Sequence, residues 1–277
     1  MNSYIILSII AIYFGILLLI AWITGRKSTS NDAFFLGNRK SPWYIVSIGM
    51  IGTSLSGVTF VSVPGMVRSI DMTYMQTVFG FFFGYILIAK VLLPLYYKLK
   101  LTSIYSYLGD RIGKRSYKTG ASFFLLSKIV GAAARLYLVV LILQHYVFST
   151  WNIPFWVTVI ISIFLVWLYT YRSGIKTIIW TDTLQALCLV AMLVVIIWKV
   201  KDAMELDMEG MVQTLTENPH FRIFEFNDWH STQHFVKQFF SGIFITIVMT
   251  GLDQDMMQKN LSCKSLKDAQ KNMYTYG

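Results

Sequence analysis

Long apolar runs constrain the fold of this chain more than any other feature of its sequence. Seven such runs alternate with short segments that carry most of the charge, and each is long enough to cross a hydrocarbon layer of about 30 Å. They cover residues 4–24, 43–67, 73–97, 119–148, 154–171, 177–199 and 238–257. The sequence therefore predicts an all-α membrane protein with about seven transmembrane helices.

Composition and charge placement exclude several other classes. Charged residues make up 14% of the 277 residues and the mean hydropathy is +0.56, whereas soluble domains carry about 25% charged residues. The net charge of +10 would suit a nucleic-acid partner, but most Lys and Arg residues lie between the apolar runs, which argues against one. Two cysteines cannot build a disulfide framework, so Cys188 and Cys263 are predicted to be reduced and structural.

Basic residues alternate from one side of the predicted membrane to the other. Lys and Arg are concentrated in four segments, 25–42, 98–118, 172–176 and 258–277. The bases of the last segment are Lys259, Lys264, Lys267 and Lys271. The segments 68–72 and 149–153 hold at most one base, and 200–237 is acidic overall. Because basic loops stay cytoplasmic, we expect a multi-pass protein of the cell (inner or plasma) membrane with its N-terminus outside and its C-terminal tail cytoplasmic.

The first apolar run is predicted to be a retained helix. It is too long for a signal peptide and lacks a basic segment before it, and Gly25-Arg26-Lys27 follows as a stop-transfer flank would.

The predicted span 43–67 is unusually polar in its middle. Residues 49–59 hold three glycines and four hydroxyl side chains, which weaken a helix and add polar groups. Small and hydroxylated residues are common where membrane helices pack closely, so one interpretation is a continuous packed helix. The other is a helix broken near the midplane, where freed carbonyls and hydroxyls bind an ion and a solute.

Several charged residues lie within predicted spans, where an unpaired charge is costly, and three of them bear on function. Lys128 and Arg135 are seven residues apart and share a helix face. Lys128 is shallow enough to extend to the interface, and Arg135 is deeper and predicted to have an internal polar role. Asp182 is the only carboxylate in the apolar part of the first six spans, and it suits a packing or capping carboxylate, a cation ligand or the partner of Arg135.

Several segments resemble the sodium:solute symporter family. YTYRSGIKTIIWTDTLQ at 169–185 is similar to the family hallmark, an aromatic-rich helix end and a glycine turn followed by Val/Ile-x-Trp-Thr-Asp-x-x-Gln. DQDMMQK at 253–259 resembles the family's Asp-Gln-Asp-x-x-Gln-Arg segment, and 261–270 resembles the amphipathic helix after it. DAFFLGNR at 32–39, SGVTF at 56–60, Pro64-Gly65 and the segment 101–111 also fit the family pattern, in the right order along the chain.

The resemblance implies a LeuT-like fold, in which one extra helix precedes two five-helix repeats of inverted topology. Residues 4–24 would be the extra helix, 43–199 the first repeat, 200–237 an extracytoplasmic loop and 238–277 the start of the second repeat. Residues 1–277 would then form a single transporter domain that is incomplete, because the second repeat is largely missing. We expect either a fragment of a longer protein or a truncated gene product.

The resemblance also implies sodium-coupled symport of a small organic solute, such as a sugar, sialic acid or another carboxylate, or an amino acid. Sodium would bind backbone carbonyls of Gly52 and Leu55, completed by hydroxyls of the second repeat, and Asp182 would couple cation binding to transport. The partners are then sodium, the solute and the lipid bilayer, and no cofactor is expected. The oligomeric state is not predicted.

Solute contacts follow from the same resemblance. Ser54, Ser56 and Thr59 would line the cavity, with Arg135 as a further substrate-binding residue. In the sialic-acid branch an arginine lies about one turn earlier, where this chain has Gly131, which weakens a prediction of sialic acid itself.

Two other classes remain open on the sequence. One is the membrane domain of a symporter-like sensor, which a signalling module downstream would reveal. The other is a membrane-embedded enzyme, for which no convergent catalytic set is evident, so enzymatic activity is not predicted. A metal site at His230 and His234 is also weakly supported, because only these two candidate ligands are close in sequence.

Overall fold

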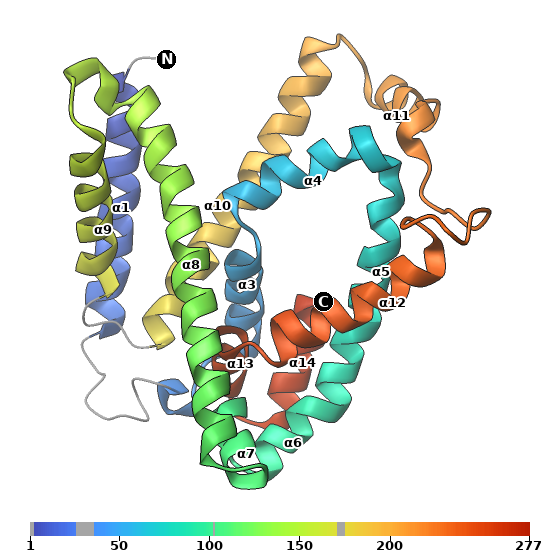
Figure 1. The fold of residues 1–277 in the computed structure, drawn as a ribbon. Helices are drawn as coiled ribbons and strands as arrows, with labels where there is room; N and C mark the ends of the chain where they lie inside the picture. Colours follow the sequence, from blue (N-terminus) through green and yellow to red (C-terminus); the bar gives the residue numbers. More distant parts are fainter. Residues whose placement is uncertain (1–2, 26–35, 102, 171–174) are drawn as a thin grey trace. The chain divides into compact units, whose positions relative to one another are not determined.

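The computed structural model describes residues 3–25, 36–101, 103–170 and 175–277, and the chain divides into two compact units (Figure 1). The first unit comprises residues 1–38 and 101–181, and the second comprises residues 39–100 and 182–277. Residues 32–35 of the predicted loop motif and 171–174 of the predicted hallmark lie outside the described residues.

The first unit is built from long apolar helices. It contains α1 (Ser3–Gly25), α7 (Ile104–Arg111), α8 (Lys114–Tyr146) and α9 (Phe155–Thr170), with a short 3₁₀ turn at Phe148–Trp151. Helix α9 packs against α1 and α8. Gln144 on α8 joins α9 through a hydrogen bond from Thr158 Oγ1 of 2.5 Å and also donates to the Ile153 carbonyl at 2.7 Å. These bonds satisfy the polar groups at the turn that connects the two helices.

The second unit contains shorter and more strongly bent helices. They are α3 (Trp43–Ser54), α4 (Gly57–Ile70), α5 (Tyr74–Leu87), α6 (Leu93–Lys98), α10 (Ile175–Ala203, in this unit from Asp182), α11 (Met208–Thr216), α12 (Phe235–Thr246), α13 (Gln254–Leu261) and α14 (Leu266–Tyr276). Short 3₁₀ turns occur at Asp71–Thr73 and Pro219–Phe221. A further 3₁₀ turn, Gly37–Arg39, lies at the boundary between the units.

The predicted break within 43–67 is confirmed. Helix α3 ends at Ser54 and α4 begins at Gly57, while Leu55 (φ −78°, ψ 127°) and Ser56 (φ −125°, ψ 159°) are extended. The interpretation as one continuous packed helix is therefore wrong for this span. The glycines and hydroxyls that weakened the helix signal surround the residues where the helix stops.

The prediction of seven plain spans is too simple. Only four helical runs among the described residues are long and apolar enough to cross a membrane, namely Tyr4–Thr24, Gly57–Lys98, Lys114–Tyr146 and Ile175–Ala203. Phe235–Gly251 and Gln254–Leu261, bent by 66°, make a fifth if they count as one span. Each of the seven predicted segments contains helix over most of its described residues, but breaks leave α3 with 12 residues, and α9 has only 16.

Helices α5 and α12 lie side by side and approach very closely (Figure 1). A Cβ atom placed on Gly80 would lie 2.1 Å from the Phe239 carbonyl oxygen, and one on Gly242 would lie 2.2 Å from the Thr77 carbonyl oxygen. Glycine on both helices therefore permits backbone contact, as is common in membrane bundles. Each of these helices continues into one π-helical turn, Ile88–Leu92 after α5 and Ile247–Gly251 after α12.

Helix α14 completes the packing around the first π turn. A π turn disturbs the regular pairing of backbone groups, and the Ala89 carbonyl accepts a hydrogen bond of 2.9 Å from Gln270 Nε2 of α14. Helix α14 also packs on α3 and buries Ala269, Asn272 and Met273. The amphipathic helix predicted for 261–270 is thus present as an element of the core of the second unit.

Candidate functional site

The break between α3 and α4 leaves backbone carbonyls outside the helical ladder. The Leu55 amide still donates to the Ile51 carbonyl at 2.9 Å, but the Thr59 amide donates to Ser56 Oγ at 3.1 Å. Within the described part of the chain, no hydrogen bond to the Leu55 carbonyl is found. The Gly52 carbonyl accepts one from Gln185 Nε2 of α10 at 3.2 Å. Both carbonyls predicted to bind sodium therefore lie at the break, and that of Gly52 has a side-chain donor.

The predicted solute-binding hydroxyls also serve the local backbone. Ser54 Oγ donates to the carbonyls of Met50 and Ile51 at 2.9 and 3.1 Å. Ser56 is the N-cap of α4, and its Oγ atom lies 2.9 Å from Thr59 Oγ1. Ser54 is exposed, whereas Ser56 and Thr59 are half-buried. The structure brings all three hydroxyls to the break and gives each of them a structural partner.

Gly52 sets the approach of α10 to the break. A Cβ atom on Gly52 would lie 2.1 Å from the Asp182 carbonyl oxygen and 3.2 Å from the Ala186 amide nitrogen. Close packing, one of the two interpretations of the glycine-rich stretch, is thus correct for this residue, although the helix breaks three residues later. The contact brings the α10 backbone at Asp182 against α3.

Asp182 lies beside the break in a buried ion pair. Its Oδ2 atom accepts a hydrogen bond of 3.0 Å from Thr53 Oγ1, and the Lys259 ammonium contacts both of these oxygens. Only 4% of the Lys259 side chain and 18% of the Asp182 side chain are exposed. Asp182 therefore has an ionic partner in Lys259, which the sequence did not suggest, while its predicted pairing with Arg135 and its role as a cation ligand stay predictions.

Lys259 is buried, although the prediction of membrane orientation counts it among the basic residues of the C-terminal tail. It lies on α13 within the core of the second unit. Its neighbours on the helix, Met256, Met257, Asn260 and Leu261, are also buried. The signal that pointed to it was its place at the end of the DQDMMQK segment, where the family pattern has an arginine.

Arg135 and Lys128, the two bases predicted within the fourth span, lie in the first unit. Arg135 lies on α8 and is exposed. Lys128, on the same helix, is half-buried, and its ammonium lies over the Phe124 ring, 5.3 Å from the ring centroid. An aromatic face attracts a cation, which gives Lys128 a partner within its own helix.

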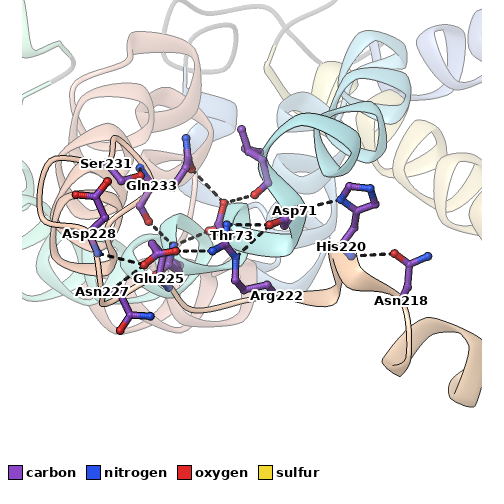
Figure 2. Close-up of polar contacts among 12 residues, drawn as sticks. Asp71, Thr73, Asn218, His220, Arg222, Glu225, Asn227, Asp228, Ser231 and Gln233 are labelled. Atoms are coloured by element: carbon purple, nitrogen blue, oxygen red, sulfur yellow. Dashed lines mark hydrogen bonds and ion pairs between the residues drawn. The ribbon is translucent and has the colours of Figure 1, made fainter.

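A second polar cluster joins the α4–α5 corner to the loop that precedes α12 (Figure 2). His220 Nδ1 lies 2.8 Å from one Asp71 oxygen, and Arg222 Nε donates to the other at 3.1 Å. Arg222 Nη1 also donates to Glu225 Oε2 at 2.6 Å. The Glu225 carboxylate accepts further hydrogen bonds from the backbone amides of residues 227 and 228, which lower its pKa.

Gln76 anchors this loop from inside α5. Its side chain is fully buried, donates to the Gln233 carbonyl at 2.9 Å and accepts from the Glu225 amide at 3.1 Å. Thr73 Oγ1 lies 3.1 Å from Gln233 Oε1. The segment 219–234, predicted as part of a plain loop, is therefore tightly held against the start of α5 (Figure 2). No local sequence pattern predicts this contact, because its partners are about 150 residues apart.

Of the two histidines considered as metal ligands, His234 has a structural role. His234 Nδ1 accepts from the Val236 amide at 3.3 Å at the start of α12, and His230 is exposed. No group of three or more His, Cys, Asp or Glu residues that could hold a metal occurs among the residues described.

The sequence is similar to transporters along most of its length. The model of the sodium:solute symporter family matches residues 34–275. The sodium/sialic acid symporter SiaT of Proteus mirabilis (strain HI4320) is 27% identical over 271 residues, which cover 95% of this chain and 52% of that protein. The sodium-coupled monocarboxylate transporter 1 of Homo sapiens is 26% identical over 259 residues, which cover 92% and 41%. The chain thus spans about half the length of these relatives.

The fold agrees with this similarity. A solved structure, described as the substrate-bound outward-open state of a Na⁺-coupled sialic acid symporter, superposes with a TM-score of 0.82. The two are 24% identical, and the match covers 99% of this chain and 56% of the other. The LeuT-like fold predicted from the sequence is confirmed. Because the family model covers most of the sequence, this multi-pass membrane protein belongs to the sodium:solute symporter family.

Proposed function

We propose that the protein is a secondary active transporter that carries a small organic solute across the cell membrane together with sodium. The observation that supports this most directly is the helix break beside the Asp182–Lys259 ion pair, since broken helices near the midplane form the substrate and ion sites of many transporters. Relatives named for the sodium-coupled transport of sialic acid, monocarboxylates and iodide support the same class of function.

Sodium is proposed to bind at the break as a transported substrate. The Leu55 carbonyl, which lies outside the helical ladder, and the Gly52 carbonyl are the proposed backbone ligands, and Asp182 is proposed to couple cation binding to transport. A sodium ion takes several oxygen ligands, so two carbonyls form only part of a site. The proposal therefore requires further oxygen ligands from elsewhere in the protein.

The solute is proposed to carry a carboxylate. Ser54, Ser56 and Thr59, at the break, can donate hydroxyl hydrogen bonds to such a group. Arg135, in the first unit, is proposed as a substrate-binding residue on the family resemblance alone. Because Ser56 and Thr59 already bond to each other and to the start of α4, a bound carboxylate would exchange one of these contacts for its own. Solutes of this class include sialic acid and other organic acids. Amino acids, which are zwitterionic, and sugars, which are neutral, are the alternatives.

The sodium gradient supplies enough free energy for such transport. Moving one positive charge down a potential of about 100 mV releases about 2.3 kcal/mol. At about 1.4 kcal/mol for each factor of ten, each net positive charge that enters with the solute sustains a solute gradient of roughly 50-fold. A monoanionic solute gains this contribution only when more than one sodium ion accompanies it; with one sodium ion, the sodium concentration gradient alone drives its uptake. Transport of this kind needs no hydrolysis.

Uptake into proteoliposomes tests the proposal. The purified protein would be reconstituted, an inward gradient of sodium or choline imposed, and accumulation of labelled sialic acid, lactate, glucose, proline and iodide measured. We expect one solute to accumulate only with sodium, and Asp182→Asn to weaken the sodium dependence of its uptake more than it lowers the amount of folded protein. Accumulation that is equal with sodium and choline would contradict sodium coupling, and unchanged sodium dependence in the variant would make Asp182 structural.

The proposed orientation places residue 206 outside and residue 114 in the cytoplasm. Single cysteines at these positions, in a background without Cys188 and Cys263, would be treated with an impermeant thiol reagent on intact cells. We expect labelling at 206 and not at 114, because the surrounding basic and acidic segments follow the positive-inside rule. The opposite labelling would invert the topology.

A further inference from the structure

We propose that Lys259 is a built-in cation that occupies the cation position at Asp182, so that sodium must displace its ammonium group to bind there. The inference rests on the proposed sodium coupling and adds a positioning residue to it. It predicts that the affinity of the protein for sodium is set partly by a competitor within its own chain.

The geometry around Asp182 carries this inference. One carboxylate oxygen, Oδ2, contacts the Lys259 ammonium and also accepts the hydrogen bond from Thr53 Oγ1. The ammonium contacts the same Thr53 hydroxyl, which lies two residues before the break. A single cation therefore already sits between a carboxylate and a hydroxyl, and both are ligand types that sodium takes.

Charge and burial make the two cations mutually exclusive. The Lys259 side chain is 4% exposed, so water does little to screen its charge from a second cation at the same oxygen. An unpaired carboxylate that is largely removed from water is costly, so we expect a cation beside Asp182 both before and after sodium binds. Sodium and the ammonium group can each fulfil that role, but they cannot occupy the same oxygen together.

The position of Lys259 links its displacement from Asp182 to the packing of α13. It lies on α13, which follows a 66° bend after the π turn Ile247–Gly251 and packs on α3. Lysine has a flexible stem and three rotatable donors, so its head can leave Asp182 while Met256 and Met257 stay buried. Binding of sodium at the break would thereby release a contact that holds α13 to α3 and α10.

Sodium-dependent thermal unfolding of the purified protein tests the competition. Lys259→Met removes the ammonium group and should lower the half-saturating sodium concentration about tenfold or more, because a site occupied by a competitor most of the time loses affinity in proportion. Lys264→Met is the matched control, since Lys264 is exposed a few residues away and should leave the sodium titration unchanged. Lys259→Arg, which keeps a cation, should resemble the native protein more than Lys259→Met does.

A second measurement uses the native chain and does not depend on a variant that folds. Amine modification of Lys259, followed by peptide mass spectrometry, should be several-fold faster in saturating sodium than in choline, while Lys264 reacts equally in both. An unchanged rate at Lys259, or an unchanged half-saturating concentration in Lys259→Met, would overturn the inference.

The same titrations separate this inference from the proposed function. If Asp182→Asn shifts the sodium titration but Lys259→Met does not, the competition is refuted and sodium coupling stands. If the native protein shows no response to sodium in stability or in uptake, the proposed function fails, and the inference fails with it.

Discussion

The contact between Gly52 and α10 gives the sharpest quantitative prediction, Gly52→Ala compared with Gly57→Ala. The new methyl group at 52 would lie 2.1 Å from the Asp182 carbonyl oxygen, about 1.3 Å inside the 3.4 Å at which ordinary contact begins. Backbone must move to admit it, and overpacking of this kind costs about 1–3 kcal/mol. Alanine regains up to about 1 kcal/mol of helix propensity over glycine. Because the clash is with backbone, which cannot yield as a side chain end does, the cost lies in the upper part of its range, about 2–3 kcal/mol, and the expected net loss is about 1–2 kcal/mol.

Gly57 is the matched control, because it lies on the other side of the same break with nothing within 4 Å of its Cβ position. Alanine there should stabilise the protein by about 0.4–1 kcal/mol through the unfolded chain. Thermal unfolding in detergent would measure both variants. We expect the midpoint to fall by about 2–8 °C for Gly52→Ala and to hold or rise slightly for Gly57→Ala.

A functional readout accompanies the stability measurement. Because the Gly52 contact aligns Thr53 with Asp182, a separation of α3 from α10 should also raise the sodium concentration needed for half-maximal uptake. Equal midpoints for the two alanine variants would refute the close-approach argument, and the glycine at 52 would then be incidental.

Three further predictions concern other parts of the second unit. Gly242→Ala, whose Cβ would lie 2.2 Å from an α5 carbonyl oxygen, should lower the unfolding midpoint, whereas Gly65→Ala, with nothing within 4 Å, should not. The Glu225 carboxylate has a lowered pKa, so its stabilisation is present above the usual glutamate pKa of about 4.3 and is lost as the pH falls through the lower folded value. The difference in unfolding midpoint between the native protein and Glu225→Gln should therefore be largest near pH 7 and vanish in acid; a constant difference would contradict this role. Burial raises the pKa of the Cys263 thiol to about 12, so brief maleimide treatment at pH 8 of a variant without Cys188 should leave Cys263 unmodified until the protein is unfolded, and equal modification of folded and unfolded protein would show that Cys263 is not buried.

The helical class and the break near Ser56 follow from local chemistry, which explains why the sequence predicts them. Apolar runs report membrane-length helices directly, and glycines with hydroxyl residues report where a helix is weak. The same reasoning does not reveal how a weak point is used. Ser56 caps α4, and Gly52 lets the backbone of α10 approach α3 closely. Both roles depend on the three-dimensional contacts of these residues, which the sequence around the break does not reveal.

Long-range pairs were the part that the sequence does not predict. From the sequence, Asp182 suits a packing or capping carboxylate, a cation ligand or the partner of Arg135, and Lys259 is not suggested. Lys259 lies in a polar segment with an ordinary composition, so only the bend of 66° after α12 brings it to Asp182. The contacts of Gln76 with the loop before α12 were missed for the same reason, since they join residues about 150 positions apart.

The Asp182–Lys259 pair also has a consequence for the biogenesis of the protein. The two residues are 77 positions apart, so at about 5–20 residues per second the ribosome delivers Lys259 about 4–15 s after Asp182. During that interval α10 must enter the membrane with its acid unpaired. Its 29 residues exceed the roughly 20 that span the bilayer, so the segment after Asp182 can insert first and leave the carboxylate at the aqueous boundary. Asp182 would then reach its final depth only after α13 is synthesised, so the final position of α10 in the membrane would depend on a helix made later.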